Sequence, residues 1–170
     1  GFTSYDVSTS AQKLPYTYSL LDQALQGQSP RVVVLETNML FRKFTVDDAL
    51  WRTLADTFPI LEHHDRWKSL RPVDLTARAK ATWTDPHKGF RSNDAVKPSS
   101  AKGYMKPSSD RAVIRPLNRW YLERIVERCR EHGACVVLLS TPSTKNWNFK
   151  RHNAVQDLLD EHPDWTDVSY

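Results

Sequence analysis

The chain has 170 residues, of which 39% are hydrophobic and 26% charged, and its formal net charge is +4. This length and composition are typical of one folded domain with a substantial core, and they exclude an intrinsically disordered chain. No apolar run approaches the ~20 residues that a membrane helix needs, and no basic segment followed by an apolar run marks a signal peptide.

Strand and helix patterns alternate at the beginning of the chain. Residues 2–7 are rich in β-forming side chains and predict a strand. Apolar spacing predicts a helix over residues 14–26, with Gly27 as its cap. The β-branched apolar run of residues 31–38, which turns polar at its carboxyl end, predicts a second strand, and residues 47–58 predict a second helix. Strand, helix and strand in close succession form a βαβ unit with a right-handed crossover.

This alternation fails over residues 72–110, which hold several prolines and no sustained period. An irregular insertion inside a compact domain is typical of a functional or mobile loop, and residues 73–83 can form a short helix within it. The wider tract of residues 80–119 is basic, which indicates either a polyanion-binding surface or a solvated loop. Its cations include Lys88, Arg91, Lys97, Lys102, Lys106, Arg111 and Arg115.

Regular patterns return near residue 117. Apolar spacing predicts a helix over residues 117–132, with a cationic last turn and a cap at Gly133. A strand over residues 135–139, a helix over residues 148–161 and a strand from residue 165 follow. The alternation as a whole predicts an α/β fold.

The strand of residues 135–139 predicts where a site would lie. It is a continuous apolar run without polar alternation, which is typical of a strand covered on both faces in a parallel sheet. Polar side chains gather just after it, at Ser140, Thr141, Ser143 and Asn146. Ligands of open α/β sheets bind outside the carboxyl ends of strands, so we expect this loop to form part of a site.

Neither the cysteines nor the histidines form a metal-binding pattern. Cys129 falls late in a predicted helix and Cys135 begins the next strand, without zinc-ligand spacing. We expect two buried free thiols, with a disulfide across the helix–strand turn as the alternative. His63 and His64 are adjacent and therefore do not point at one centre. With five glycines in all, the chain lacks both usual phosphate loops, and we expect no cofactor.

Several short segments, taken in their order along the chain, carry a resemblance. They are residues 6–12 before a helix that contains Pro-Tyr, residues 30–36, residues 64–67, residues 102–104, and residues 138–143 followed by Trp147, His152 and Asn153. Together they cover most of the chain. In this order they resemble the SGNH/GDSL hydrolase superfamily, specifically its bacterial cell-envelope members.

The resemblance implies a three-layer α/β/α sandwich with a mainly parallel sheet, flavodoxin-like in topology, with residues 72–110 as a long irregular insertion. In this family a serine attacks an ester, an Asp-x-x-His block activates the serine, and a glycine and an asparagine donate to the oxyanion. Neither the nucleophile block nor Asp-x-x-His occurs within residues 1–170. We therefore interpret these residues as a single α/β domain, incomplete at both ends, whose catalytic residues lie outside this chain.

Five candidates for substrate or oxyanion contacts lie in the first half of the chain. Asn38 has the place of the family's oxyanion asparagine, and an asparagine that caps a turn would have the same place. Gln12, at the exit of the first predicted strand, is a residue that could orient substrate. His64, Arg66 and Trp67 suit a sugar ring or an anionic group, with an arginine–aspartate pair and a buried indole as the alternative.

Trp147 and His152, after the strand of residues 135–139, are further candidates for substrate contacts. His152 can act as a base only where a nucleophile lies within hydrogen-bond reach. A triad of Ser143, His152 and either Asp157 or Asp164 is an alternative within the chain. Triads are recognised by geometry, so the sequence leaves that alternative open.

Two classes of function follow from the sequence. The first is an SGNH/GDSL-type serine esterase or acyltransferase that acts on O-acylated carbohydrate or another ester, in the cell envelope or outside the cell. The second is a non-catalytic carbohydrate- or polyanion-binding module that uses the basic tract and the tryptophans. We expect a small-molecule or carbohydrate ester as the partner, and no nucleic acid. A flavodoxin-like signalling or nucleotide domain is disfavoured, since an acidic receiver cluster and a phosphate loop are absent.

Overall fold

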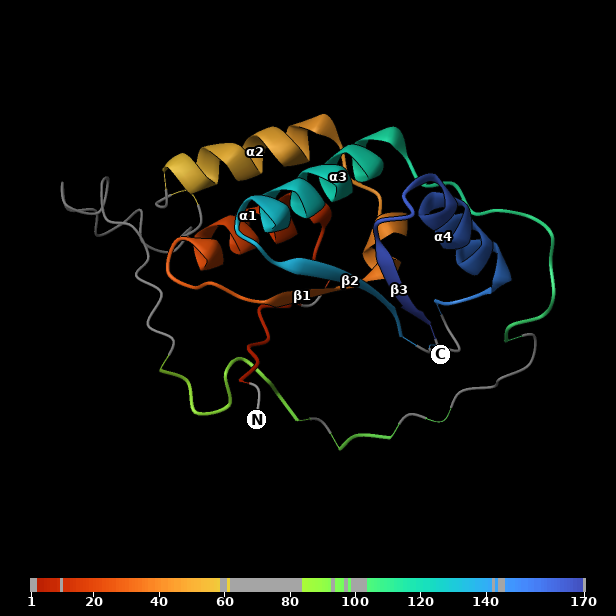
Figure 1. The fold of residues 1–170 in the computed structure, drawn as a ribbon, viewed down its shortest axis with the longest axis horizontal. Helices are drawn as coiled ribbons and strands as arrows, with labels where there is room; N and C mark the ends of the chain where they lie inside the picture. Colours follow the sequence, from red (N-terminus) through yellow and green to blue (C-terminus); the bar gives the residue numbers. More distant parts are fainter. Residues whose placement is uncertain are drawn as a thin grey trace.

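The computed structural model describes residues 3–9, 11–58, 61, 84–92, 94–96, 98, 104–141, 143 and 146–169. Within these residues the fold is α/β, as predicted, with a small parallel sheet in the order β1-β2-β3 (Figure 1). None of the helices in the described part of the chain has the length and apolar character needed to cross a bilayer. The elements are α1 (Leu14–Leu25), β1 (Val32–Glu36), the 3₁₀ helix η1 (Thr37–Phe41), α2 (Val46–Thr57), α3 (Pro116–Glu131), β2 (Cys135–Ser140), α4 (Phe149–Glu161) and β3 (Thr166–Ser169).

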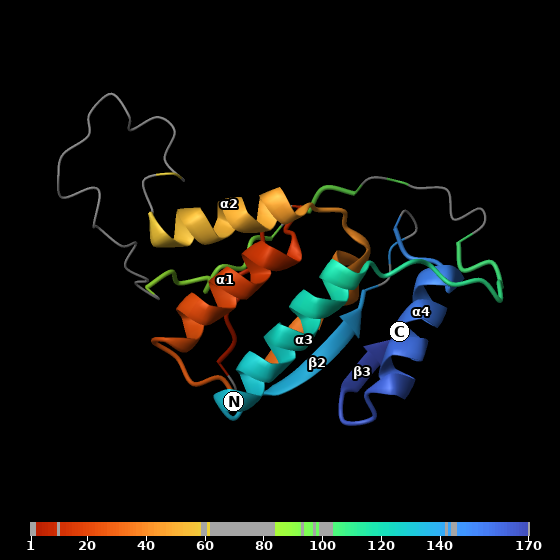
Figure 2. The same ribbon diagram turned by 90° about the horizontal axis from the view of Figure 1, so that it is seen from above.

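The sheet topology places the helices. β1 pairs with β2 from Val32–Cys135 to Glu36–Leu139, and β2 pairs with β3, both in parallel. Strands that follow one another in sequence and pair in parallel need crossovers, and right-handed crossovers put α3 and α4 on the same face of the sheet. The helices α1, α2 and α3 lie together on one side of the sheet, and α4 runs beside β3 (Figures 1 and 2).

The two faces of the sheet differ in burial. Leu35 of β1 and Leu138 of β2 point to the helix-covered face and belong to the main hydrophobic core. On the opposite face, Val32 is 52% exposed and Val34 is 56% exposed. The described residues therefore do not confirm a sheet that is covered on both faces. An apolar run shows that a strand is hydrophobic, but the placement of the helices decides which face they cover.

The predicted first strand is also wrong, because residues 3–9 form no ladder. The backbone N–H of Asp6 donates to the carbonyl of Lys88 at 2.8 Å, and the Asp6 carboxylate accepts from the N–H of Ser8 at 2.8 Å. Gly89 makes this approach possible, because its φ is +85° and a Cβ there would lie 1.8 Å from the Asp6 carbonyl oxygen. A segment rich in β-forming residues stays irregular without a partner strand.

The helix boundaries agree closely with the sequence patterns. Gly133 caps α3 with φ +70°, as predicted. By contrast, α1 ends at Leu25 with Gln26 as a right-handed C-cap, and Gly27 has no positive φ. The helix predicted over residues 73–83 lies outside the described residues. At the start of α2, Thr45 and Asp48 form a capping box that the apolar pattern alone did not reveal.

The two cysteines are both free thiols, but only one of them is buried. Cys129 lies in the core of α3, and burial raises the pKa of its thiol to about 11. Cys135 is exposed, so the prediction of two buried thiols is wrong for this residue. It begins β2 beside Val32, on the face of the sheet that the helices leave open.

Candidate functional site

Polar side chains from two strands meet where β1 and β2 end. Glu36 is the last residue of β1 and Asn38 lies in η1 directly after it, while Thr141 follows β2. Because the two strands are parallel and Glu36 is in register with Leu139, both strands end at the same edge of the sheet. We call Glu36, Asn38, Thr141 and Arg151 of α4 the carboxyl-edge cluster.

One carboxylate oxygen connects the ends of the two strands. The Glu36 Oε1 accepts hydrogen bonds from Asn38 Nδ2 at 2.7 Å and from Thr141 Oγ1 at 2.9 Å. Beside it, the hydroxyls of Thr37 and Ser140 lie 3.0 Å apart, and both residues are buried. Buried hydroxyls of this kind need such a partner, so the pair holds the two strand ends in register.

Arg151 brings α4 to the same cluster. Its Nη1 donates to Asn38 Oδ1 at 2.9 Å and also to the backbone carbonyl of Asn146. Its guanidinium carbon lies 5.0 Å from the centroid of the Phe41 ring, within cation–π range. Burial lowers the pKa of the Arg151 guanidinium, with Arg42 acting in the same direction.

The start of α4 fixes the position of Arg151. Asn148 is the N-cap, and its side-chain oxygen accepts from the backbone N–H of Arg151 at 3.1 Å. The first turn of α4 carries no acidic residue, although acids are the residues that the helix dipole favours there. Lys150 lies in the same first turn, so this mismatch alone does not distinguish Arg151 in the sequence.

Gln12 lies near the cluster but is engaged locally. Its side-chain oxygen accepts from the backbone N–H of Thr9 at 2.7 Å, and its Nε2 donates to Thr17 Oγ1 at 2.8 Å. The Thr17 hydroxyl in turn lies 3.9 Å from the sulfur of Met39 in η1. Gln12 therefore stabilises the turn before α1, beside the segment that carries Asn38.

Trp147 is a core residue, which corrects its interpretation as a substrate contact. It is 3% exposed and belongs to the main hydrophobic cluster, because its large apolar ring gains most from leaving water. Its backbone N–H donates to the carbonyl of Ser143 at 3.0 Å. The ring therefore supports the loop after β2 from inside and is not available to a ligand.

His152 lies on α4 with its ring 6.1 Å from that of Phe149. Among the described residues no hydrogen bond joins Ser143, His152 and either proposed aspartate. Asp157 instead pairs with Arg111, and Asp164 pairs with Arg130. This arrangement gives no support to the triad alternative within the chain.

The candidates His64, Arg66 and Trp67 lie outside the described residues. Within the part of the chain that the structure describes, no group of three His, Cys, Asp or Glu side chains could hold a metal ion.

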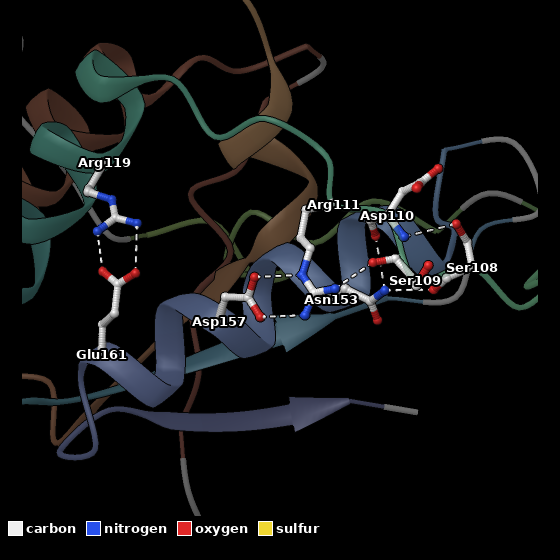
Figure 3. Close-up of polar contacts among 8 residues, drawn as sticks. All are labelled: Ser108, Ser109, Asp110, Arg111, Arg119, Asn153, Asp157 and Glu161. Carbon is white, nitrogen blue, oxygen red and sulfur yellow. Dashed lines mark hydrogen bonds and ion pairs between the residues drawn. The ribbon is translucent and has the colours of Figure 1, made fainter.

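The described cations of the basic tract are partly neutralised by the acidic last helix. Residues 108–112, which we call the α4 strap, run along α4 (Figure 3). Asn153 Nδ2 donates to the backbone carbonyls of Ser108 at 2.8 Å and Asp110 at 3.0 Å. Arg111 binds Asp157 through Nε at 2.8 Å and through Nη2 at 3.2 Å.

Further contacts secure this arrangement. The backbone N–H of Ala112 donates to the carbonyl of Lys150 at 2.8 Å, and the Lys150 ammonium lies 2.6 Å from the Asp110 carboxylate. On α3, Arg119 pairs with Glu161 at the other end of α4 (Figure 3). Two cations of the basic tract, Arg111 and Arg119, therefore already have internal partners.

A hollow of about 330 Å³ lies elsewhere, between the start of α1 and one face of α2. Lys13 and Asp48 pair across it at 3.1 Å, and the Arg52 guanidinium lies 4.9 Å from the Tyr16 ring centroid. The hydrogen bond from the Thr45 backbone, followed by that from Lys13, lowers the pKa of the Asp48 carboxyl. The charged side chains that line this hollow pair with each other and stabilise the packing of α1 against α2. We therefore place the candidate site at the carboxyl-edge cluster and not in the hollow.

Comparison of the chain with protein-family models, curated proteins and solved structures gives no match.

Proposed function

We propose that this chain belongs to a serine esterase or acyltransferase of the SGNH/GDSL type, which acts on O-acylated carbohydrate or another ester in the bacterial cell envelope. The nucleophilic serine and the Asp-x-x-His block come from outside these 170 residues. The observation that carries the proposal is the position of Asn38, held by its amide at the carboxyl edge of a parallel sheet.

Asn38 has the chemistry of an oxyanion donor. One hydrogen of its Nδ2 goes to Glu36, and no contact among the described residues takes the second. A fixed amide N–H at ~3 Å from the developing oxyanion is the arrangement that stabilises a tetrahedral intermediate. The surrounding contacts hold this donor in place before a substrate binds, which reduces the reorganisation needed during the reaction.

The reaction in this proposal has two steps. The serine oxygen attacks the ester carbonyl and passes its proton to the histidine, while Asn38 donates to the oxyanion. Collapse of the intermediate breaks the ester C–O bond, and the leaving alcohol takes that proton from the histidine. A water molecule or a second alcohol then attacks the acyl-enzyme, which gives hydrolysis or acyl transfer.

The open face of the sheet supports the finer fold in this proposal. Val32 and Val34 expose apolar surface on the face opposite α1 and α3. In a three-layer α/β/α sandwich of flavodoxin-like topology, a second helix layer covers that face. We propose that further residues of the intact protein supply this layer.

Turnover of p-nitrophenyl acetate and of O-acetylated sugars by the intact protein tests the function. Asn38→Ala should lower kcat by about 100-fold or more with a smaller change in KM, since it removes an oxyanion donor. Asn153→Ala is the matched control, because this asparagine bonds to the α4 strap and should leave turnover unchanged.

Three results would count against parts of the proposal. Unchanged kcat in Asn38→Ala would remove Asn38 from the reaction. Absence of both turnover and fluorophosphonate labelling in the wild-type protein would contradict the esterase function. Sugar binding by that inactive protein would instead favour the non-catalytic module.

A further inference from the structure

We propose that Arg151 is a positioning residue that turns the amide of Asn38 so that its nitrogen, not its oxygen, faces the reacting ester. This inference rests on the function proposed above and adds a residue that the resemblance does not assign. Its basis is the contact of Arg151 Nη1 with Asn38 Oδ1 at 2.9 Å, from an element far along the chain.

Charges on opposite sides permit only one orientation of the amide. The amide oxygen of Asn38 faces the Arg151 guanidinium, which only donates, and the amide nitrogen faces the Glu36 carboxylate, which accepts. A flipped amide would place its NH₂ group against the cation and its oxygen against the anion. Both hydrogen bonds would become repulsive, so the network selects the donor orientation.

Arg151 also makes the environment of Asn38 more favourable to negative charge. The Glu36 carboxylate accepts from the same amide and acts against the burial that lowers the pKa of the Arg151 guanidinium, so the Arg151 cation offsets the negative charge beside Asn38. The positive end of the α4 dipole acts in the same direction as Arg151. An oxyanion beside Asn38 is therefore destabilised less than it would be by Glu36 alone.

The position of Arg151 is unfavourable for the helix alone. A cation in the first turn opposes the helix dipole, and the half-buried guanidinium has lost part of its hydration. The Asn146 carbonyl and the Phe41 ring hold the guanidinium in this place. A residue that opposes local preference but is firmly held by tertiary contacts is typical of a functional site.

The test compares Arg151→Met, Arg151→Lys and Arg111→Met in the intact protein. Arg111 is the matched control, because it is also an arginine bound to a polar side chain at α4, but at the strap. Turnover of p-nitrophenyl acetate is measured per active site, counted by fluorophosphonate labelling, so that unfolded protein does not enter kcat.

Arg151→Met should lower kcat by about 10- to 100-fold with little change in KM, because a misplaced donor affects the transition state more than substrate binding. Arg151→Lys should recover part of kcat, and added guanidinium ion should partly rescue Arg151→Met. Arg111→Met should keep the wild-type kcat and should not respond to guanidinium.

The outcomes separate the two proposals. Wild-type kcat per active site in Arg151→Met overturns the positioning role and leaves the esterase function intact. A loss that neither lysine nor guanidinium restores, and that affects kcat and KM equally, also overturns it, because that pattern indicates general structural damage. An inactive and unlabelled wild-type protein overturns the esterase function, and the positioning role with it.

Discussion

The carboxyl-edge cluster and the α4 strap are two polar networks that both contact α4, and they differ in exposure and in what they hold in place. In the cluster, Arg151 is half-buried, and Arg151 and Glu36 both bond to one amide, that of Asn38. In the strap, Arg111 and Asp157 form an exposed bidentate pair that joins a loop to the helix. Exposed pairs are screened by water and salt, whereas partly buried networks hold atoms in fixed positions.

Two asparagines show the same contrast without any charge. Asn118 of α3 is 1% exposed and donates from Nδ2 to the carbonyl of Arg42, directly after η1. Asn153 of α4 donates to two carbonyls of the α4 strap, near the surface. Asn118 therefore supports the segment that carries the cluster, and Asn153 attaches a loop.

Replacement of Asn118 and Asn153 should give the largest difference in stability between the two regions. Asn118→Ala should lower the free energy of unfolding by about 2 kcal/mol, because it removes a buried side chain together with its hydrogen bond to the Arg42 carbonyl. Asn153→Ala should have a smaller effect, since water can reach the strap carbonyls. Urea unfolding of both variants checks this order, and equal losses would show that exposure does not separate the two regions.

Removal of the α4 cap should have an intermediate effect. Asn148→Ala should lower the free energy of unfolding by about 1 kcal/mol, since it removes the acceptor for the Arg151 backbone N–H. Asn148→Asp keeps an acceptor and should retain most of that stability. Thermal unfolding measures the difference, and a loss as large in Asn148→Asp as in Asn148→Ala would contradict a capping role.

The strap should show the smallest effect on stability and a clear effect on pKa. The hydrogen bond and charge of Arg111 lower the pKa of the Asp157 carboxyl in the folded protein. Any stability from this pair is therefore fully present above the ordinary aspartate pKa of ~3.9 and is lost as pH falls through the lower folded value. Arg111→Met should raise the Asp157 pKa toward its ordinary value.

Carboxyl NMR titration of Asp157 measures this change. The Asp48 pKa, which the Thr45 backbone and Lys13 lower at the start of α2, serves as the internal control and should stay where it is in Arg111→Met. An Asp157 pKa that does not move in this variant would show that Arg111 is not its partner in solution. High salt should also weaken the pairing in the wild-type protein.

Much of the secondary structure could be predicted because its signals are local. The apolar spacing of α1, α3 and α4 and the β-branched runs of β1 and β2 lie within single short windows. Gly133 could be predicted as a cap from its place after a cationic last turn. The strand predicted from residues 3–7 was wrong, since β-forming residues favour a strand but a ladder also requires a partner strand.

The candidate site was predicted only in part. Asn38 and the loop after β2 could be placed at one edge, because parallel strands end together. Arg151 was missed and Trp147 was misplaced, although both lie close in sequence to His152. Nothing in a short window distinguishes an arginine that reaches a distant amide from one in solvent, or a buried tryptophan from an exposed one.

The sequence by itself determined which segments are helices and strands, and that polar residues follow two of the strands. Only the tertiary structure decided that α1 and α3 cover the face of the sheet with Leu35 and Leu138, and that Arg151 meets Asn38 across 113 positions of the chain. The physical reason is that periodicity and caps depend on neighbours within a few residues. The packing of elements that are distant in sequence determines which charged and amide side chains interact, and a local sequence pattern does not predict that packing.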